Sequence, residues 1–359
     1  MKKPTIRNIL VPIDFSRMSI GAIRDAQDVA EQFGATVHLA HVYHQQYPIG
    51  FMDPVLAAGE PGVSFEDHRE RSLEEELATV ARENGLPESA PTHLCEGGSV
   101  FHEICRLAGA IRADLIVMPT HGRTGLRHVF LGSTAERVVQ HSPCPVLVTR
   151  PRKKGMKPAA TAAVRRGGTI LVPVDFSDAS FEALEYAIAH ARQTADRLII
   201  LNAIHLSDEL GTEGLGVYRL ADFRQTARWD AGREMNQFLG AANFGEVSFE
   251  TVIRIGKPAD EICAVAEKRA VDLIITGTHG RTGLKHLVMG SVAEQVVRRA
   301  RQSVLVVPSH PGLRAESLSR IDAREREPAL TGSEAIAAAR FGKGLRKGLG
   351  LFPASQTTS

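Results

Sequence analysis

The chain lacks several sequence features that mark large classes of protein. It has one tryptophan among 359 residues, and only 5% of its residues are aromatic. No apolar run reaches the roughly 18 residues of a membrane helix, and the run from Ile9 to Ile13 ends at Asp14, too early for a signal peptide. The 43 basic and 41 acidic residues nearly cancel. The net charge therefore does not indicate a nucleic-acid or membrane partner, and we expect neither.

Cysteine is also scarce. The four cysteines, Cys95, Cys105, Cys144 and Cys263, show no C-x-x-C spacing. This pattern argues against a zinc site or a disulfide framework and is typical of a reducing compartment, so we expect a cytoplasmic protein. The hydrophobic fraction of 43% is that of a globular chain, and the length allows two domains of ordinary size.

The most informative feature of the chain is an internal repeat. Residues 8–16, which end in Val-Pro-Ile-Asp-Phe-Ser, return as residues 169–177, which end in Val-Pro-Val-Asp-Phe-Ser. Residues 120–126, Thr-His-Gly-Arg-Thr-Gly-Leu, return unchanged as residues 278–284. Two copies of one domain follow from these matches.

Composition predicts where the two domains begin and end. We expect one domain over 1–150, a linker over 151–168 that is rich in Lys, Arg and Gly, and a second domain over 169–310. The tail 311–359 has the composition of a disordered segment. Within it, residues 333–347 can be interpreted either as a solvated stretch or as a short basic helix.

Each repeat alternates short β-branched runs with segments of helical period. This pattern predicts an α/β fold with a doubly wound, five-stranded parallel sheet of Rossmann type in each repeat. In the first repeat we expect strands near 7–13, 36–43, 91–95, 114–118 and 145–149, and helices near 19–33, 65–84, 99–112 and 133–141. In the second repeat we expect strands near 169–174, 197–204, 247–253, 272–276 and 303–307.

A glycine-rich loop follows the fourth expected strand of the second repeat. It reads Gly277-Thr-His-Gly280, then nine residues, then Gly290-Ser291. Ser291 and Glu294 have the spacing of a capping box, which predicts a helix start there. The free N–H groups of a helix start bind phosphate, and Arg281 would add a charge-assisted contact. The alternative is that the glycines only turn the chain sharply after a buried strand.

These residues resemble the ATP-binding members of the universal stress protein family. The family pattern is G-x-x-G, nine residues, then G-S or G-T, with an aspartate that ends the first strand. Gly277, Gly280, Gly290, Ser291 and Asp175 fit it in the second repeat. The resemblance covers about 5–150 and 168–308, and implies the family's adenine-nucleotide-binding fold.

The resemblance also implies a ligand and two sets of binding residues. The ligand is ATP, alone or with Mg²⁺. The aspartate lies beside the adenosine, the end of the second strand lies beside the adenine, and the glycine-rich loop lies beside the phosphates. The set in the second repeat is Pro173, Asp175, Ala203, Thr276, Gly277, Gly280, Arg281, Gly290, Ser291 and Val292. The set in the first repeat is Pro12, Asp14, Val42, Met118, Gly122, Arg123, Gly132, Ser133 and Thr134.

The first repeat departs from the pattern at one position. Pro119 stands where the second repeat has Gly277. Proline has no N–H and a fixed φ, so it cannot donate to a phosphate. We therefore expect the first site to be weaker than the second, or lost.

Three kinds of function remain open, of which nucleotide-dependent signalling under stress is the first. Phosphoryl transfer needs a metal ligand and a base, yet no acidic residue lies between Gly277 and Ser291. We therefore expect no fast enzyme. A slow ATPase or autophosphorylating enzyme, with Ser291, Thr282 or Thr278 as acceptor, is the second reading, and a nucleotide-free scaffold is the third.

The last strand of each repeat predicts how the repeats assemble. Residues 146–149 and 304–307 are short, apolar edges that favour pairing. Universal stress protein domains dimerise through this strand, so the resemblance implies a dimer-like unit within one chain. Whether two chains also form a homodimer is left open by the sequence.

Overall fold

The computed structural model describes residues 6–44, 65–120, 131–150, 167–206, 217–278 and 289–309, without the side chains of 65–67 and 217–221. The expected linker up to residue 166 and the tail from residue 310 lie outside these ranges. Residues 121–130 and 279–288, the middle of each glycine-rich loop, also lie outside them.

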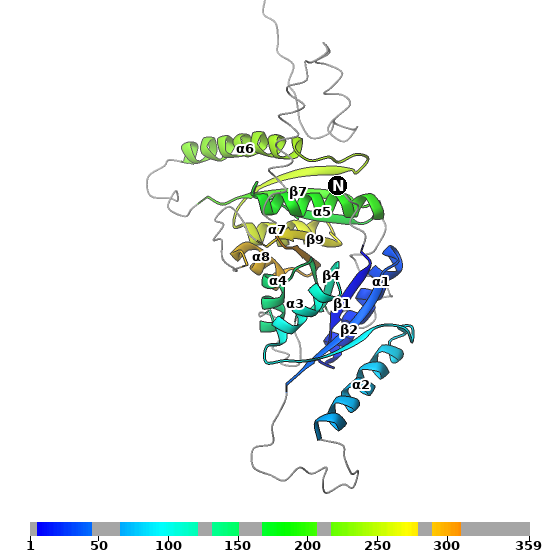
Figure 1. Cartoon of the computed structure of the whole chain (residues 1–359). Coiled ribbons are helices and arrows are strands. Elements are labelled where there is room, and N and C mark those ends of the chain that lie inside the picture. The colour runs from blue at the N-terminus through cyan, green and yellow to red at the C-terminus, as the bar shows by residue number, and fades with distance from the viewer. Residues whose placement is uncertain are drawn as a thin grey trace, which may run out of the picture.

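The two repeats contain the same series of elements (Figure 1). The first repeat consists of β1 (Asn8–Pro12), α1 (Arg17–Phe33), β2 (Thr36–Tyr43), α2 (Phe65–Glu83), β3 (Thr92–Glu96), α3 (Val100–Ala110), β4 (Leu115–Pro119), α4 (Ser133–His141) and β5 (Val146–Thr149). The second consists of β6 (Thr169–Pro173), α5 (Asp178–Thr194), β7 (Arg197–Ile204), α6 (Val217–Gly240), β8 (Phe249–Ile255), α7 (Pro258–Lys268), β9 (Leu273–Gly277), α8 (Ser291–Arg299) and β10 (Ser303–Val307). Within the described residues, no helix is both long and apolar enough to cross a membrane.

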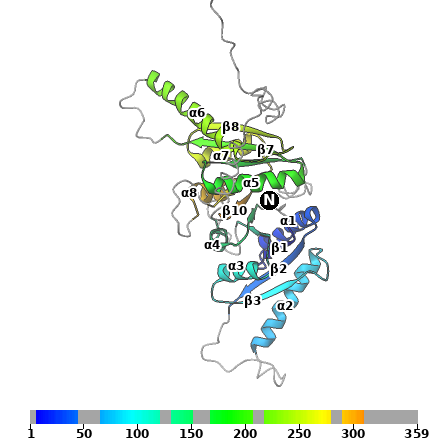
Figure 2. The same ribbon diagram turned by 45° about the horizontal axis from the view of Figure 1, so that its top comes forward.

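The ten strands of the described ranges form one sheet with the order β3-β2-β1-β4-β5-β10-β9-β6-β7-β8. Pairing within each repeat is parallel, as the predicted α/β pattern requires. The repeats join through an antiparallel pair of β5 and β10, in which Leu147 lies opposite Leu305. This pair confirms the predicted dimer-like unit. The strands β3 and β8 are the two ends of the sheet, with α2 and α6 at opposite ends of the molecule (Figure 2).

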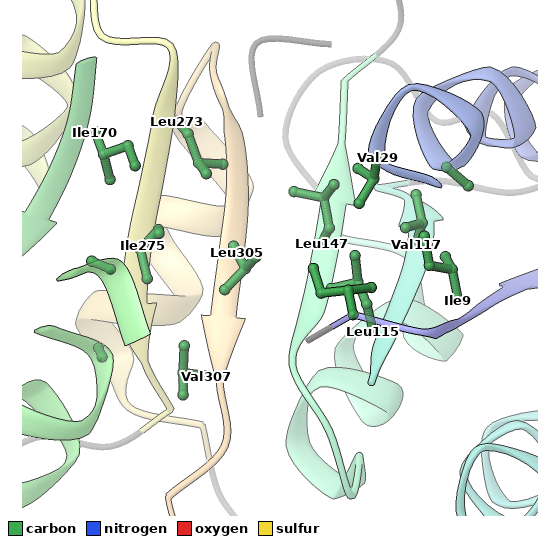
Figure 3. Close-up of a cluster of buried hydrophobic side chains, with 14 of the residues drawn as sticks. Ile9, Val29, Leu115, Val117, Leu147, Ile170, Leu273, Ile275, Leu305 and Val307 are labelled. Carbon is green, nitrogen blue, oxygen red and sulfur yellow. The ribbon is translucent and has the colours of Figure 1, made fainter. Parts of the chain in front are cut away.

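The sheet separates two apolar layers, and each layer runs through both repeats. One layer includes Ile9 and Leu115 of the first repeat together with Leu273 and Leu305 of the second. Figure 3 shows these side chains on the central strands of both repeats. Because burial of apolar surface is the main favourable contribution to folding, the continuous core couples the two repeats.

Polar and aromatic contacts also cross between the repeats. The guanidinium of Arg150 donates to the carbonyl of Val297 on α8. Arg298 lies 3.6 Å from the carboxylate of Glu136 on α4. On the other face of the sheet, the rings of Phe33 and His190 are 5.6 Å apart. The repeats therefore meet on both faces of the sheet as well as along the β5–β10 pair.

One helix end distinguishes the repeats and gives a prediction. The C-cap residue that follows α1 is Gly34, with φ of 69°, whereas the one that follows α5 is Ala195, with φ of 58°. A left-handed residue with a Cβ is strained, and Ala195 is exposed, so its methyl group adds little packing. We expect Ala195→Gly to raise the free energy of unfolding by about 0.5–1 kcal/mol. Urea unfolding measures this free energy. Gly34→Ala is the matched control, and it should lower the free energy of unfolding.

Candidate functional site

The site aspartates lie just beyond the first strand of each repeat, where the strand order reverses. In the first repeat β1 lies between β2 and β4, and in the second β6 lies between β7 and β9. A crevice between diverging connections forms at such a point, at the carboxyl ends of the strands. Asp14 and Asp175 are both half-buried there.

Each aspartate closes a tight turn with its own carboxylate. Oδ1 of Asp14 accepts the N–H of Ser16 at 3.0 Å and the hydroxyl of Ser19 at 2.6 Å. Oδ1 of Asp175 accepts the N–H and the hydroxyl of Ser177 at 3.1 and 2.5 Å. The carboxylate is therefore held in place by the backbone that follows it, which orients it before any ligand arrives.

The residue after each aspartate is strained. Phe15 has φ of 60° and Phe176 has φ of 65°, a conformation that bulky residues adopt only when their surroundings impose it. The ring of Phe15 lies 4.5 Å from that of His41, and the ring of Phe176 lies 5.5 Å from that of Phe238. This packing offsets a strain of about 1–3 kcal/mol, of the kind found at binding sites.

The second strand of each repeat also supports the turn. Nδ1 of His41 lies 2.9 Å from the carbonyl oxygen of Ile13, and Nδ2 of Asn202 donates to the carbonyl of Val174 at 2.9 Å. A carbonyl only accepts, so the facing nitrogen of His41 carries the proton. These carbonyls precede the aspartates by one residue, so both sides of each aspartate are anchored.

Gly277 ends β9 against the first turn of α5. A Cβ at Gly277 would lie 2.6 Å from the carbonyl oxygen of Ala179 and 2.9 Å from its carbon. Real Cβ atoms do not approach a backbone so closely, so this packing requires glycine. Pro119 takes the same place in the first repeat, as a buried residue opposite Thr149. The structure thus gives the glycine a packing role that the sequence did not reveal.

The expected capping box at Ser291 is wrong. α8 begins at Ser291, and its cap is Gly290, which makes no side-chain cap hydrogen bond. Glu294 instead pairs with Arg298 at 2.6 Å. The physical reason is that Gly290 is extended, with φ of −59° and ψ of 140°, which leaves the serine inside the helix as its first residue. α4 begins in the same way at Gly132 and Ser133.

The start of α8 is tied to the end of β9. The N–H of Gly290 donates to the carbonyl of Thr278 at 2.7 Å, and in the first repeat Gly132 donates to Thr120 at 2.8 Å. Since Gly277 contacts Ala179, the aspartate turn, the first turn of α5, the end of β9 and the start of α8 form one continuous rim. A helix start without a side-chain cap leaves backbone N–H groups that favour an anion.

The structure places most of the predicted residues at these strand and helix ends. The ends of strands in the second repeat hold Pro173, Ala203, Thr276 and Gly277, and the start of α8 holds Gly290, Ser291 and Val292. The first repeat has Pro12, Val42 and Met118 in its strands and Gly132, Ser133 and Thr134 at the start of α4. Gly280, Arg281, Gly122 and Arg123 lie outside the described residues.

Sequence reasoning missed the supporting residues of the turn. Ser16 and Ser177 cap α1 and α5 by accepting the N–H of the serine three residues later, each at 3.2 Å. The signal was present, because Asp-Phe-Ser-x-x-Ser occurs in both repeats. The hydrogen bonds of His41 and Asn202 had no such signal, since the two residue types differ.

Metal and thiol chemistry have little support within the part of the chain that the structure describes. Within the described residues, no three His, Cys, Asp or Glu side chains gather in a way that could hold a metal ion. Burial raises the pKa of the Cys105 thiol to about 11 and also raises that of Cys263. Thiols with a raised pKa are weakly nucleophilic at neutral pH, which is typical of cysteines that serve as packing residues.

The chain matches known proteins in both repeats. A sequence model of the universal stress protein family matches residues 5–150 and 168–308. Universal stress protein MJ0531 of Methanocaldococcus jannaschii is 33% identical over 138 residues, which are 38% of this chain and 80% of that protein. Universal stress protein Rv2005c of Mycobacterium tuberculosis is 25% identical over 197 residues, 54% of this chain and 61% of that protein.

Solved structures show the same fold over most of the chain. A universal stress protein from Archaeoglobus fulgidus has a TM-score of 0.53 at 19% identity, over 86% of this chain and 98% of that one. A functionally unknown protein from Pseudomonas aeruginosa has a TM-score of 0.56 at 20% identity, over 90% and 98%. With two matches to the family that together span most of its length, the chain belongs to the universal stress protein family.

Proposed function

We propose that the chain binds ATP in the second repeat, where Asp175, Gly277 and Gly290 border one rim at the carboxyl end of the sheet. The nucleotide acts as a signal: it stabilises one conformation or assembly of a stress-response protein. The corresponding place in the first repeat binds the nucleotide more weakly or not at all, because Pro119 replaces the glycine.

The proposal rests on one observation, that an oriented carboxylate and an anchored helix start border the same rim. The carboxylate of Asp175 is held by Ser177 at 2.5 Å, and the start of α8 is held by Gly290 and Thr278 at 2.7 Å. An oriented carboxylate suits the hydroxyl groups of a ribose, and an uncapped helix start suits phosphates. The two ends of a nucleotide thus have complementary groups on one rim.

The same groups favour binding over fast chemistry. Oδ1 of Asp175 already accepts two hydrogen bonds from Ser177, which suits a fixed acceptor better than a mobile base. Ser291 is exposed at the first position of α8, so slow autophosphorylation at this hydroxyl is the second candidate. ATP serves either activity, with or without Mg²⁺.

The nucleotide content of the purified full-length chain tests the proposal. After denaturation, the released small molecules are separated by anion exchange. We expect intact ATP, at up to one molecule per chain. ADP alone would favour turnover instead. If no nucleotide is released, ATP is added to the purified chain. At an ATP concentration of about 100 times a dissociation constant in the micromolar range, binding should raise the free energy of unfolding by about 2.7 kcal/mol. No release and no stabilisation would refute the proposal.

A further inference from the structure

The outer edge of β8 is unpaired among the described residues. β8 (Phe249–Ile255) is the last strand in the order of the sheet, and β7 is its only partner strand among the residues that the structure describes. It has seven residues, two more than β3 at the opposite end. Long edge strands with apolar residues are templates for pairing with another chain. Figure 2 shows β8 at the end of the molecule, beside α6.

The hydrogen bonds to β7 show which backbone groups of β8 point outward. Leu198 donates to the carbonyl of Ser248 at 2.9 Å, and Gly256 donates to the carbonyl of Ile204 at 3.0 Å. Backbone groups of successive strand residues alternate in direction, so the even-numbered residues face β7. The outward N–H and C=O groups belong to the four odd-numbered residues, Phe249, Thr251, Ile253 and Ile255.

An antiparallel pair of two β8 strands centred on Val252 uses all of these outward groups. In that register Thr251 lies opposite Ile253 of a second copy, and Phe249 lies opposite Ile255. Both are hydrogen-bonded pairs in an antiparallel ladder, because the backbone N–H and C=O groups of both members point outward. The pairs are also aromatic and β-branched combinations, which stabilise neighbouring strands.

The charges of β8 are self-complementary in the same register. Glu250 lies two residues before Val252 and Arg254 two residues after it, so each Glu250 faces Arg254 of the other copy, twice in the pair. These are the closer, non-hydrogen-bonded positions, where opposite charges attract. Glu250 is about 40% exposed, and its neighbour within the chain, Arg269, is 3.7 Å away.

We propose that a second copy of this chain docks on the edge of β8, so that two ten-stranded sheets join antiparallel about Val252. A two-fold axis through Val252 generates the contact, and the interface is closed because the same edge is used by both copies. The helix α6, which packs against β8, carries two exposed aromatic residues, Phe223 and Trp229, with exposed fractions of 40% and 70%. The β3 edge has no such charge pairing, since Glu96 would face Thr92.

Charge reversal tests the register. Analytical ultracentrifugation of the full-length protein should show a dimer, and Glu250→Arg or Arg254→Glu should each raise its dissociation constant on the order of tenfold, since two attractive pairs become repulsive. The double variant Glu250→Arg/Arg254→Glu should restore it. An equimolar mixture of the two single variants should also dimerise, because their edges are complementary.

Two controls keep the result specific. Arg269→Ala removes the neighbour of Glu250 within the chain and should leave the dimer intact, and Glu96→Arg at the other edge should do the same. Thermal melts establish that each variant is folded. A monomeric wild-type protein, single variants that dimerise as well as the wild type, a folded double variant that stays monomeric, or a dimer lost in either control would each overturn the proposal.

Discussion

Gly277→Ala should destabilise the second repeat by about 1–3 kcal/mol, the usual effect of overpacking a tight contact. The added Cβ would lie 2.6 Å from the carbonyl oxygen of Ala179 and 2.9 Å from its carbon. Neither atom belongs to a flexible side chain, so the first turn of α5 must shift. Urea unfolding measures the loss of stability. Faster amide hydrogen exchange in α5 would show that this helix is the destabilised region.

Gly240→Ala is the matched control for this change. Gly240 is the last residue of α6, and a Cβ there meets no atom within 4 Å. Alanine is a better helix former than glycine, so this variant should keep or raise stability. Equal stability of Gly277→Ala and the wild type would show that α5 does not approach β9 as closely as the structure has it.

The same contact changes how the nucleotide site is best probed. Gly277→Pro would copy the first repeat, but it would also displace the helix that follows the turn at Asp175. A loss of affinity in that variant would mix packing with binding. A substitution that preserves shape at the aspartate separates the two effects.

Asp175→Asn should weaken ATP binding about 10- to 100-fold, because a hydrogen bond to a charged group contributes about 1.5–3 kcal/mol. Asparagine keeps an oxygen for the N–H of Ser177, which lies 3.1 Å from the carboxylate, so the turn should persist. Isothermal titration calorimetry measures the affinity, and a thermal melt shows that the fold is retained.

Asp14→Asn in the first repeat is the control, since its carboxylate closes the equivalent turn. We expect it to change ATP affinity little, because Pro119 replaces the glycine of that site. If Asp14→Asn weakened binding and Asp175→Asn did not, the nucleotide would belong in the first repeat, and the assigned order of the two sites would be wrong.

Much of the architecture could be predicted from the sequence. The alternation of β-branched runs and helical segments predicted the parallel strands and the crossovers, and the helix expected near 133–141 is α4. The apolar runs at 146–149 and 304–307 predicted the pair that joins the repeats. These inferences succeeded because the hydrophobic pattern of a strand or a helix is a property of a short segment, and because the family resemblance implied which strands pair.

Other features depend on distant segments and could not be predicted. The capping box failed at Ser291 because the backbone of Gly290, held by Thr278 of the preceding strand end, decides where α8 begins. The left-handed conformation of Phe176 likewise depends on packing against Phe238 in α6. Local spacing carries no information about either contact.

The sequence by itself determined that the chain is a tandem repeat of one α/β domain with the glycine pattern of a nucleotide site, because repeats and spacings are written along the chain. Only the tertiary structure decided that β3 and β8 are the two ends of the joined sheet formed by the described residues. It also decided why Gly277 is glycine. The reason is steric, since the contact with Ala179 exists only after a helix some hundred residues earlier has packed against the strand.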